Sequence, residues 1–137
     1  MIIIKDLPSE LDILSKIIPS IMSEIKALSL SEEDCFNIKL SLEEALTNAI
    51  KHGNKMNPAL FVKLKIEYAH DKLTITIEDQ GEGFDYQHLS DPSKDGNLHN
   101  TSGRGVFLIK NLMDEVNFFS GGRGIKMTKS CKKEAKT

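Results

Sequence analysis

Residues 43–53 have the sequence EEALTNAIKHG, and this stretch ends a longer amphipathic segment. The segment begins at Ser31, and Ser31 followed by Asp34 resembles a capping box with Asp in place of the usual Glu. It reaches Gly53, a residue type that commonly terminates helices. The pattern therefore predicts a helix from Ser31 to about Gly53.

This predicted helix carries a polar stripe. Glu44 and Asn48 are four residues apart and His52 is four further on, so the three would share one face, with Lys51 near it. A solvated face is the usual explanation for Glu and Lys at such spacing. It suits Asn less well, because Asn is a poor helix former, whereas its amide oxygen suits Mg²⁺. Glu43 points roughly 100° away from Glu44, so Glu44 is the candidate catalytic carboxylate.

A hairpin follows the helix. Residues 62–68 and 73–78 alternate between apolar and polar side chains on either side of a His70-Asp71 turn. By this alternation Asp79 would lie on the core face, where an ionised carboxylate is costly unless it is hydrogen-bonded. In the alternative interpretation, the strand ends at Glu78 and Asp79 only opens the next turn.

Gly81 and Gly83 follow that aspartate. Glycines at alternate positions allow a backbone to approach a ligand closely. A buried Asp79 beside them would suit the exocyclic amine of a purine, a donor that needs an acceptor. A Gly-x-Gly pair is a weak signal by itself.

A second glycine pair occurs in Thr101-Ser102-Gly103-Arg104-Gly105, just before an apolar helical pattern. Glycines that open a helix leave backbone N–H groups free to hold phosphate, although a flexible hinge with an N-cap has the same composition. The polar segment 85–102 before it lacks both periodicities and is expected to be a functional lid. Neither glycine pair forms a Walker-type or dinucleotide-binding motif.

The remaining pattern predicts a first strand at Ile2–Leu7, a helix from Leu11 to Leu28 that Pro19 should kink, and two closing strands near 116–119 and 125–128. The expected organisation is a single domain over residues 1–137 with a short, solvated basic tail at 129–137.

Composition excludes several classes of protein. The chain has 137 residues and a formal net charge of −2, which argues against a broad nucleic-acid-binding surface. No apolar run approaches the length of a membrane span, and the first residues lack a signal-peptide pattern. Cys35 and Cys131 have no metal-ligand spacing and are expected to be free thiols. A cytoplasmic location is expected.

The order of these motifs resembles that of the GHKL ATPases, which include gyrase-type topoisomerases and sensor histidine kinases. Glu-x-x-x-Asn on a helix precedes Asp-x-Gly-x-Gly after a strand, then a lid, then Gly-x-Gly at a helix. Within that group residues 43–53 and 102–116 are most similar to bacterial anti-sigma-factor serine/threonine kinases. Gly122-Arg123-Gly124 departs from the family, whose members commonly carry a Thr there.

The resemblance implies an α+β fold, a two-layer sandwich (the Bergerat fold) with a mixed, mostly antiparallel sheet covered on one face by helices. It implies binding of ATP and Mg²⁺, with Asn48 holding the metal, Asp79 binding the adenine amine and Glu44 acting as general base. His52 would make a supporting hydrogen bond. The implied nucleotide-binding residues are Asn48, Lys51, His52, Asp79, Gly81, Gly83, Thr101, Ser102, Gly103, Arg104, Gly105 and Val106.

The resemblance also implies partners. The substrate would be a Ser or Thr of a STAS-type anti-anti-sigma protein, and the kinase would sequester a sigma factor until that partner releases it. Homodimerisation is expected by analogy alone. Two alternatives stay open: an ATP-binding module that sequesters a partner without chemistry, and a histidine-kinase catalytic domain that acts on a separate phosphotransfer protein.

Overall fold

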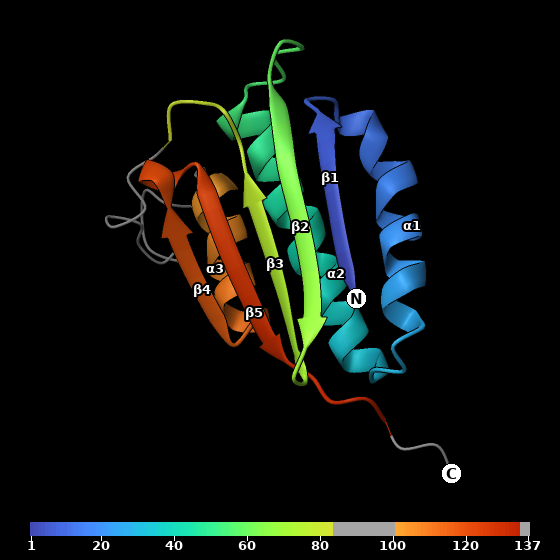
Figure 1. The fold of residues 1–137 in the computed structure, drawn as a ribbon. Helices are drawn as coiled ribbons and strands as arrows, with labels where there is room; N and C mark the ends of the chain where they lie inside the picture. Colours follow the sequence, from blue (N-terminus) through green and yellow to red (C-terminus); the bar gives the residue numbers. More distant parts are fainter. Residues whose placement is uncertain (84–100, 135–137) are drawn as a thin grey trace.

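A computed structural model describes residues 1–83 and 101–134, and it shows a five-stranded sheet with strand order β1-β2-β3-β5-β4. Figure 1 shows this sheet in front of the helices. The strands are β1 (Ile2–Pro8), β2 (Phe61–Ala69), β3 (Lys72–Glu78), β4 (Glu115–Phe119) and β5 (Gly124–Ser130), and the α-helices are α1 (Leu14–Lys26), α2 (Glu32–Thr47) and α3 (Thr101–Leu112).

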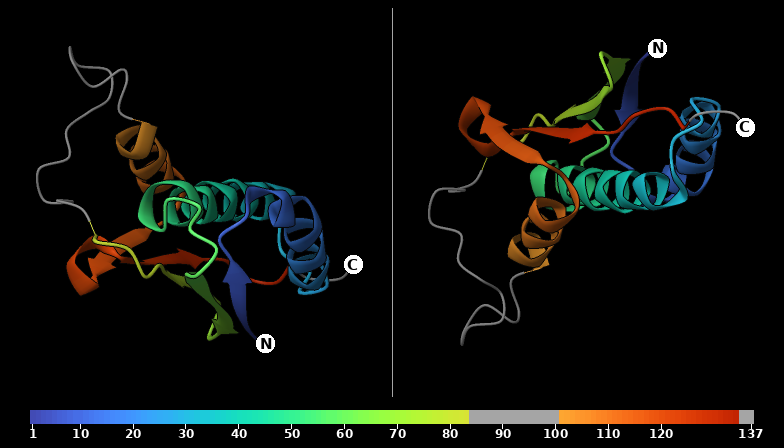
Figure 2. Two further views of the ribbon diagram at one scale, coloured as in Figure 1. Left: turned by 90° about the horizontal axis from the view of Figure 1, so that it is seen from above. Right: turned by 90° about the horizontal axis from the view of Figure 1, so that it is seen from below.

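The sheet is antiparallel in each of its four described pairings. The α+β class and the two-layer architecture are therefore confirmed, whereas the parallel pairing that a mixed sheet would contain does not occur among the described strands. Figure 2 shows the three helices together on one side of the sheet. No helix in the described ranges is long and apolar enough to cross a membrane.

The β2–β3 hairpin forms as its alternation predicts. His70 and Asp71 connect the strands with φ angles of 54° and 60°, the left-handed conformation of a tight two-residue hairpin turn. The turn fixes the register, which pairs Tyr68 with Leu73 and Leu64 with Ile77. One face of β3 is consequently buried against the helices.

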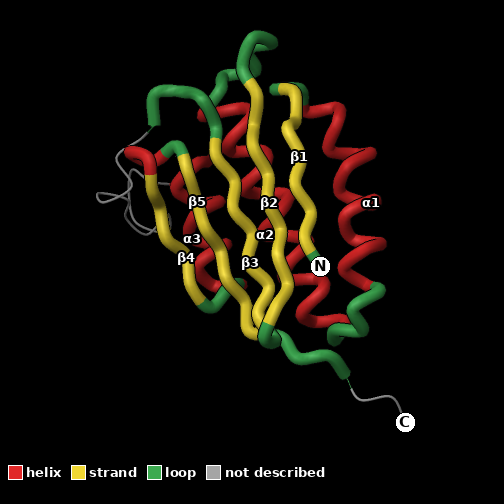
Figure 3. Tube along the Cα trace, viewed as in Figure 1, coloured by secondary structure: helices red, strands yellow, loops and turns green. Residues whose placement is uncertain are grey.

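The core fills the space between the sheet and the helices. Because α2 lies across the middle of the sheet (Figures 1 and 3), its apolar face supplies more of the core than either neighbouring helix does. The largest fully buried side chains are Ile21, Ile25, Ile38, Leu42, Leu46, Ile50, Leu64, Ile66, Leu73, Ile75, Ile77 and Ile109.

The helix predicted from Ser31 to Gly53 forms over that length but changes its winding. The Ser31 side-chain oxygen accepts a hydrogen bond from the Asp34 N–H at 3.0 Å, which confirms the predicted cap. After Thr47 the chain continues as a π-helical turn over Asn48–Gly53, and Asn54 N–H donates to Ala49 O at 2.8 Å. Such wide turns are rare and frequently occur at functional sites.

The first predicted helix is divided. Residues Leu11–Ile13 form a 3₁₀ turn, and the α-helix proper begins only at Leu14. Pro19 lies inside α1. The helix ends at Lys26, two residues before Leu28, the last residue of the predicted helix.

The C-terminal segment packs against the rest of the protein further than the predicted solvated tail at 129–137 would. Lys129 belongs to β5 and is 9% exposed, and its Nζ donates to Leu112 O at 3.0 Å and lies 3.9 Å from an Asp34 carboxylate oxygen. Glu134 N–H donates to Ser29 O at 2.7 Å, so the chain returns to the loop between α1 and α2. The tail therefore begins after the strand, later than residue 129.

Both cysteines are free and buried, as expected. Burial raises the pKa of the Cys35 thiol, and it raises that of Cys131 to about 11.

Candidate functional site

The polar stripe of α2 meets the start of α3 at Gly105. A Cβ atom at Gly105 would lie 2.8 Å from Asn48 Nδ2 and 3.0 Å from Glu44 Oε2, closer than side chains normally pack. Gly105 is itself buried, so α3 rests directly on these two side chains. The structure thus brings together Glu44, Asn48 and Gly105, three residues that the sequence could only place in order.

The glycine pair lies inside α3 rather than before it. The helix begins at Thr101, so Gly103 and Gly105 belong to its first turns, and the predicted loop that opens the helix is wrong. Glycine at position 105 lets α3 lie against the Asn48 and Glu44 side chains, which would have to shift to admit a Cβ atom. The free N–H groups of the first turn still belong to this region, although they come from helical residues.

The other predicted residues of this segment are less informative. Val106 is 5% exposed, so its side chain is part of the packed interior. The side chains of Thr101, Ser102 and Arg104 lie outside the described part of the structure, as does the predicted lid up to residue 100.

Asp79 combines the two interpretations that the sequence allowed. The strand β3 ends at Glu78, yet Asp79 is only 8% exposed and its N–H donates to Arg123 O at 2.9 Å. One carboxylate oxygen accepts the Gly81 N–H at 2.8 Å. Burial raises the pKa of Asp79, opposed by the Gly81 hydrogen bond and by the nearby Arg123 charge. Its other oxygen has no hydrogen bond within the described residues.

The glycines around Asp79 allow parts of the protein to pack closely. A Cβ at Gly53 would overlap the Asp79 carboxylate, and a Cβ at Gly81 would overlap the carbonyl of Gly53. Gly83 has a φ of 83°, and a Cβ there would overlap the Gly121 carbonyl. The first two contacts join the π-helical turn to the segment after β3, and the third joins that segment to the connection between β4 and β5. Close approach of a ligand to Gly81 or Gly83 remains a prediction.

The π-helical turn changes the winding of the helix beyond Asn48. The prediction placed Glu44, Asn48 and His52 on one face because it assumed the α-helical period throughout. A π turn winds more widely, but four residues are still close to one full turn, so the shared face of the three side chains stays a prediction. Lys51 and His52 are both exposed on this turn.

Sequence reasoning missed a buried polar cluster beside the site. Asn54 is 2% exposed and its side chain bonds to Ser9, Phe61 and Gln80. In the sequence, only the position of Asn54 directly after Gly53 pointed to a role at the site. Its partners lie up to 45 residues away in sequence, so no local pattern could have identified them.

The donor set fits the nucleotide and metal that the sequence implies. The second Asp79 oxygen, which accepts no hydrogen bond from the residues that the structure describes, is an acceptor suited to an amine. The Glu44 and Asn48 oxygens are hard donors suited to Mg²⁺. Within residues 1–83 and 101–134, no group of three or more His, Cys, Asp or Glu side chains could hold a metal ion. A magnesium ion at Asn48 would therefore need phosphate oxygens and water as its other ligands.

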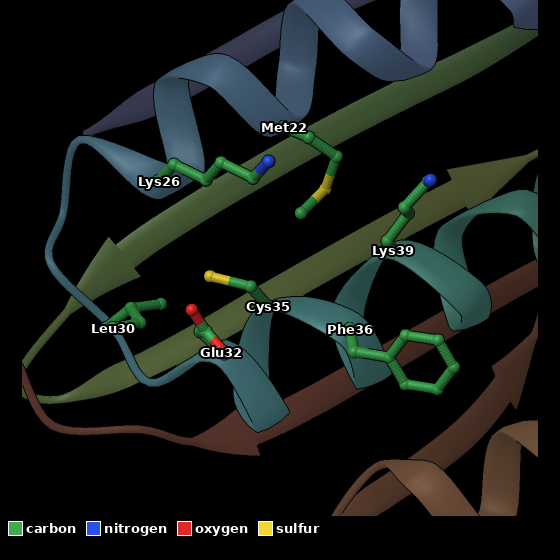
Figure 4. A pocket seen from close by; sticks show the side chains of 7 residues that line it. All are labelled: Met22, Lys26, Leu30, Glu32, Cys35, Phe36 and Lys39. Atoms are coloured by element: carbon green, nitrogen blue, oxygen red, sulfur yellow. The ribbon is translucent and has the colours of Figure 1, made fainter.

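A groove of about 440 Å³ lies elsewhere, between the end of α1 and the start of α2. Figure 4 shows Met22 and Lys26 of α1 facing side chains of α2 across it. It contains none of the predicted site residues. Its lining residues are Met22, Lys26, Leu30, Glu32, Cys35, Phe36 and Lys39.

Comparison with known proteins identifies a matching family and similar proteins. The family described as "Histidine kinase-like ATPase domain" matches residues 7–129. The "Serine-protein kinase RsbW" of Staphylococcus epidermidis is 35% identical over 136 residues, which cover 93% of this chain and 86% of that protein. The protein of the same name from Staphylococcus aureus (strain JH9) is 38% identical over 110 residues, which cover 74% and 69%.

Proposed function

The chain belongs to the histidine kinase-like ATPase domain family, and from that premise we propose that it is an ATP-dependent kinase that phosphorylates a serine or threonine of another protein. The similar Staphylococcus proteins named serine-protein kinase support this activity. The observation that carries the proposal is the contact of Gly105 with both Glu44 and Asn48, because it joins a carboxylate and a metal-ligand amide to the helix start expected to hold phosphate.

Each side chain would contribute one task. Asp79 would accept a hydrogen bond from the adenine amine, and Asn48 would hold Mg²⁺, which neutralises charge on the phosphates when bound. Glu44 would accept the proton of the incoming hydroxyl. The partly exposed position of Glu44 at the α2–α3 contact leaves this carboxylate within reach of a substrate.

The test is Glu44→Gln, which keeps the shape of the side chain and removes the base. We expect ATP affinity within a few-fold of wild type and a loss of transfer of about 10² to 10⁴-fold. Glu43→Gln is the matched control, because Glu43 is the adjacent carboxylate and forms only a 3.9 Å ion pair with Lys39. Unchanged transfer by Glu44→Gln would show that the base assignment is wrong.

The phosphorylated partner would be a STAS-type anti-anti-sigma protein, and a sigma factor would be the protein sequestered. Incubation with labelled ATP and STAS proteins encoded nearby should give acid-stable label on Ser or Thr. Acid-labile label on His would instead support a histidine-kinase catalytic domain. ATP-dependent partner binding without any labelled product would support a regulatory module.

A homodimer would use the edge strand β1. Ile2 and Ile4 are 62% and 72% exposed on the face of the sheet that carries no helices. Met1 and Tyr68 exchange backbone hydrogen bonds, so by the antiparallel alternation Ile2, Ile4 and Asp6 direct their N–H and C=O groups to the open edge. Sedimentation should show a dimer that Ile4→Lys converts to a monomer. A wild-type protein that stays monomeric at high concentration would exclude this interface.

A further inference from the structure

A hydrogen-bonded cluster around Asn54 joins the end of the π-helical turn to the segment that follows β3. Asn54 Nδ2 donates to Ser9 Oγ at 2.9 Å and to Phe61 O at 3.0 Å. Its Oδ1 accepts the Gln80 N–H at 2.7 Å, and its own N–H donates to Ala49 O at 2.8 Å. Both donor hydrogens of the amide and one acceptor site are therefore used.

The cluster is closed by bonds among its other members. Ser9 Oγ donates to Leu60 O at 2.6 Å, and Gln80 Oε1 accepts the Phe61 N–H at 2.7 Å. Ser9 is 1% exposed and Asn54 is 2% exposed. A polar group buried so completely is retained only where its partners are fixed, so the cluster holds its members in one arrangement.

The cluster is directly connected to Asp79 from two sides. Gln80, whose N–H is bonded to Asn54, is the next residue after Asp79. Gly53, which precedes Asn54, lies so close to the Asp79 carboxylate that a Cβ there would overlap it. Asn54 thus fixes both the backbone that carries the carboxylate and the backbone against which the carboxylate rests.

We propose that Asn54 is a positioning residue for base recognition: it holds the Asp79 carboxylate where the exocyclic amine of the nucleotide base must bind. The inference rests on the proposed function, in which Asp79 accepts that amine. Asn54 acts through Asp79 and does not itself contact the nucleotide. Substitution of Asn54 should therefore change which base the protein prefers. Glu44 and Asn48 would act at the phosphates instead.

The test compares ATP with inosine triphosphate (ITP), which has a carbonyl oxygen in place of the amine. Wild-type protein should bind ATP about ten-fold or more tightly than ITP, the ratio expected for a hydrogen bond to a charged group. Asn54→Ala should reduce this ratio to about two-fold or less, measured by calorimetry on protein shown to be folded by circular dichroism. A purely structural role would lower the affinity for both nucleotides together and keep the ratio.

Two further variants complete the experiment. Asn57→Ala is the matched control, because Asn57 is in the same loop but is exposed, and its side chain accepts the N–H of nearby Ala59 at 2.9 Å; it should keep the wild-type ratio. Ser9→Ala removes two bonds of the cluster, those to Asn54 and to Leu60, and should lower the ratio partway. This variant decides the question if Asn54→Ala does not fold.

The outcomes separate this inference from the proposed function. If Asp79→Ala, which removes the acceptor, abolishes the preference for ATP while Asn54→Ala and Ser9→Ala keep it, the positioning role is refuted and the adenine contact stands. If Asp79→Ala also keeps the preference, the adenine contact assigned to Asp79 is itself refuted.

Discussion

Replacement of Gly105 by alanine should separate stability from activity. The added Cβ would lie 2.8 Å from Asn48 Nδ2 and 3.0 Å from Glu44 Oε2. Ordinary contact begins at 3.4 Å, so the amide must move by 3.4 − 2.8 = 0.6 Å and the carboxylate by 3.4 − 3.0 = 0.4 Å. Both atoms are ends of flexible side chains, so they can move without displacing the backbone.

The free energies for folding partly cancel. Alanine is favoured over glycine within a helix by about 1 kcal/mol, and moving two side chains away from their preferred rotamers costs about 0.5–1.5 kcal/mol each, so the net destabilisation is about 0–2 kcal/mol. The melting temperature should therefore fall by no more than about 10 °C. Catalysis has no such compensation, since a displacement of about 1 Å can cost about 10²-fold in rate. A shift of 0.6 Å should then lower kcat/KM about ten-fold or more.

The assay measures label transfer from ATP to a STAS substrate together with a thermal melt. Lys110→Ala is the control, because Lys110 is exposed on the same helix; its kcat/KM should equal that of wild type. A Gly105→Ala protein that melts normally and retains kcat/KM within two-fold of wild type would refute the placement of Glu44 and Asn48 in the catalytic site.

Three further predictions concern other parts of the molecule. Burial raises the pKa of Asp79, so the folded state binds this proton more tightly and the carboxylate destabilises it at neutral pH. Asp79→Asn should therefore have the higher free energy of unfolding at pH 7, with an advantage that shrinks as pH falls through the folded-state pKa; an advantage that grows on acidification would contradict this. Ser31→Ala removes the N-cap of α2 and should cost about 1 kcal/mol in denaturant unfolding, whereas no change would show that the cap is replaced. Burial and the raised pKa of about 11 should make the Cys131 thiol unreactive towards alkylating reagents at pH 7 until the protein unfolds, and rapid labelling of the native protein would exclude the buried placement.

Local patterns predicted most of the fold. The alternation of β2 and β3, the turn at His70-Asp71 and the cap at Ser31 each depend on residues that are neighbours in sequence, and each is confirmed. The burial of Asp79 followed from strand parity for the same reason. Predictions that extended a regular period were less accurate, as the π-helical turn after Thr47 and the early start of α3 show.

The sequence by itself determined the order of the motifs and the side of the strand on which Asp79 lies, because periodicity and turn chemistry act over a few residues. The two-layer class followed from the resemblance of those motifs to a known family. Only the tertiary structure decided which groups meet. A Cβ atom at Gly105 would lie against the Asn48 and Glu44 side chains. Asn54 is buried with its hydrogen bonds completed by Ser9 and Gln80, which are 45 and 26 residues away in sequence. Such contacts form only when segments distant in the chain pack together, and no local pattern encodes them.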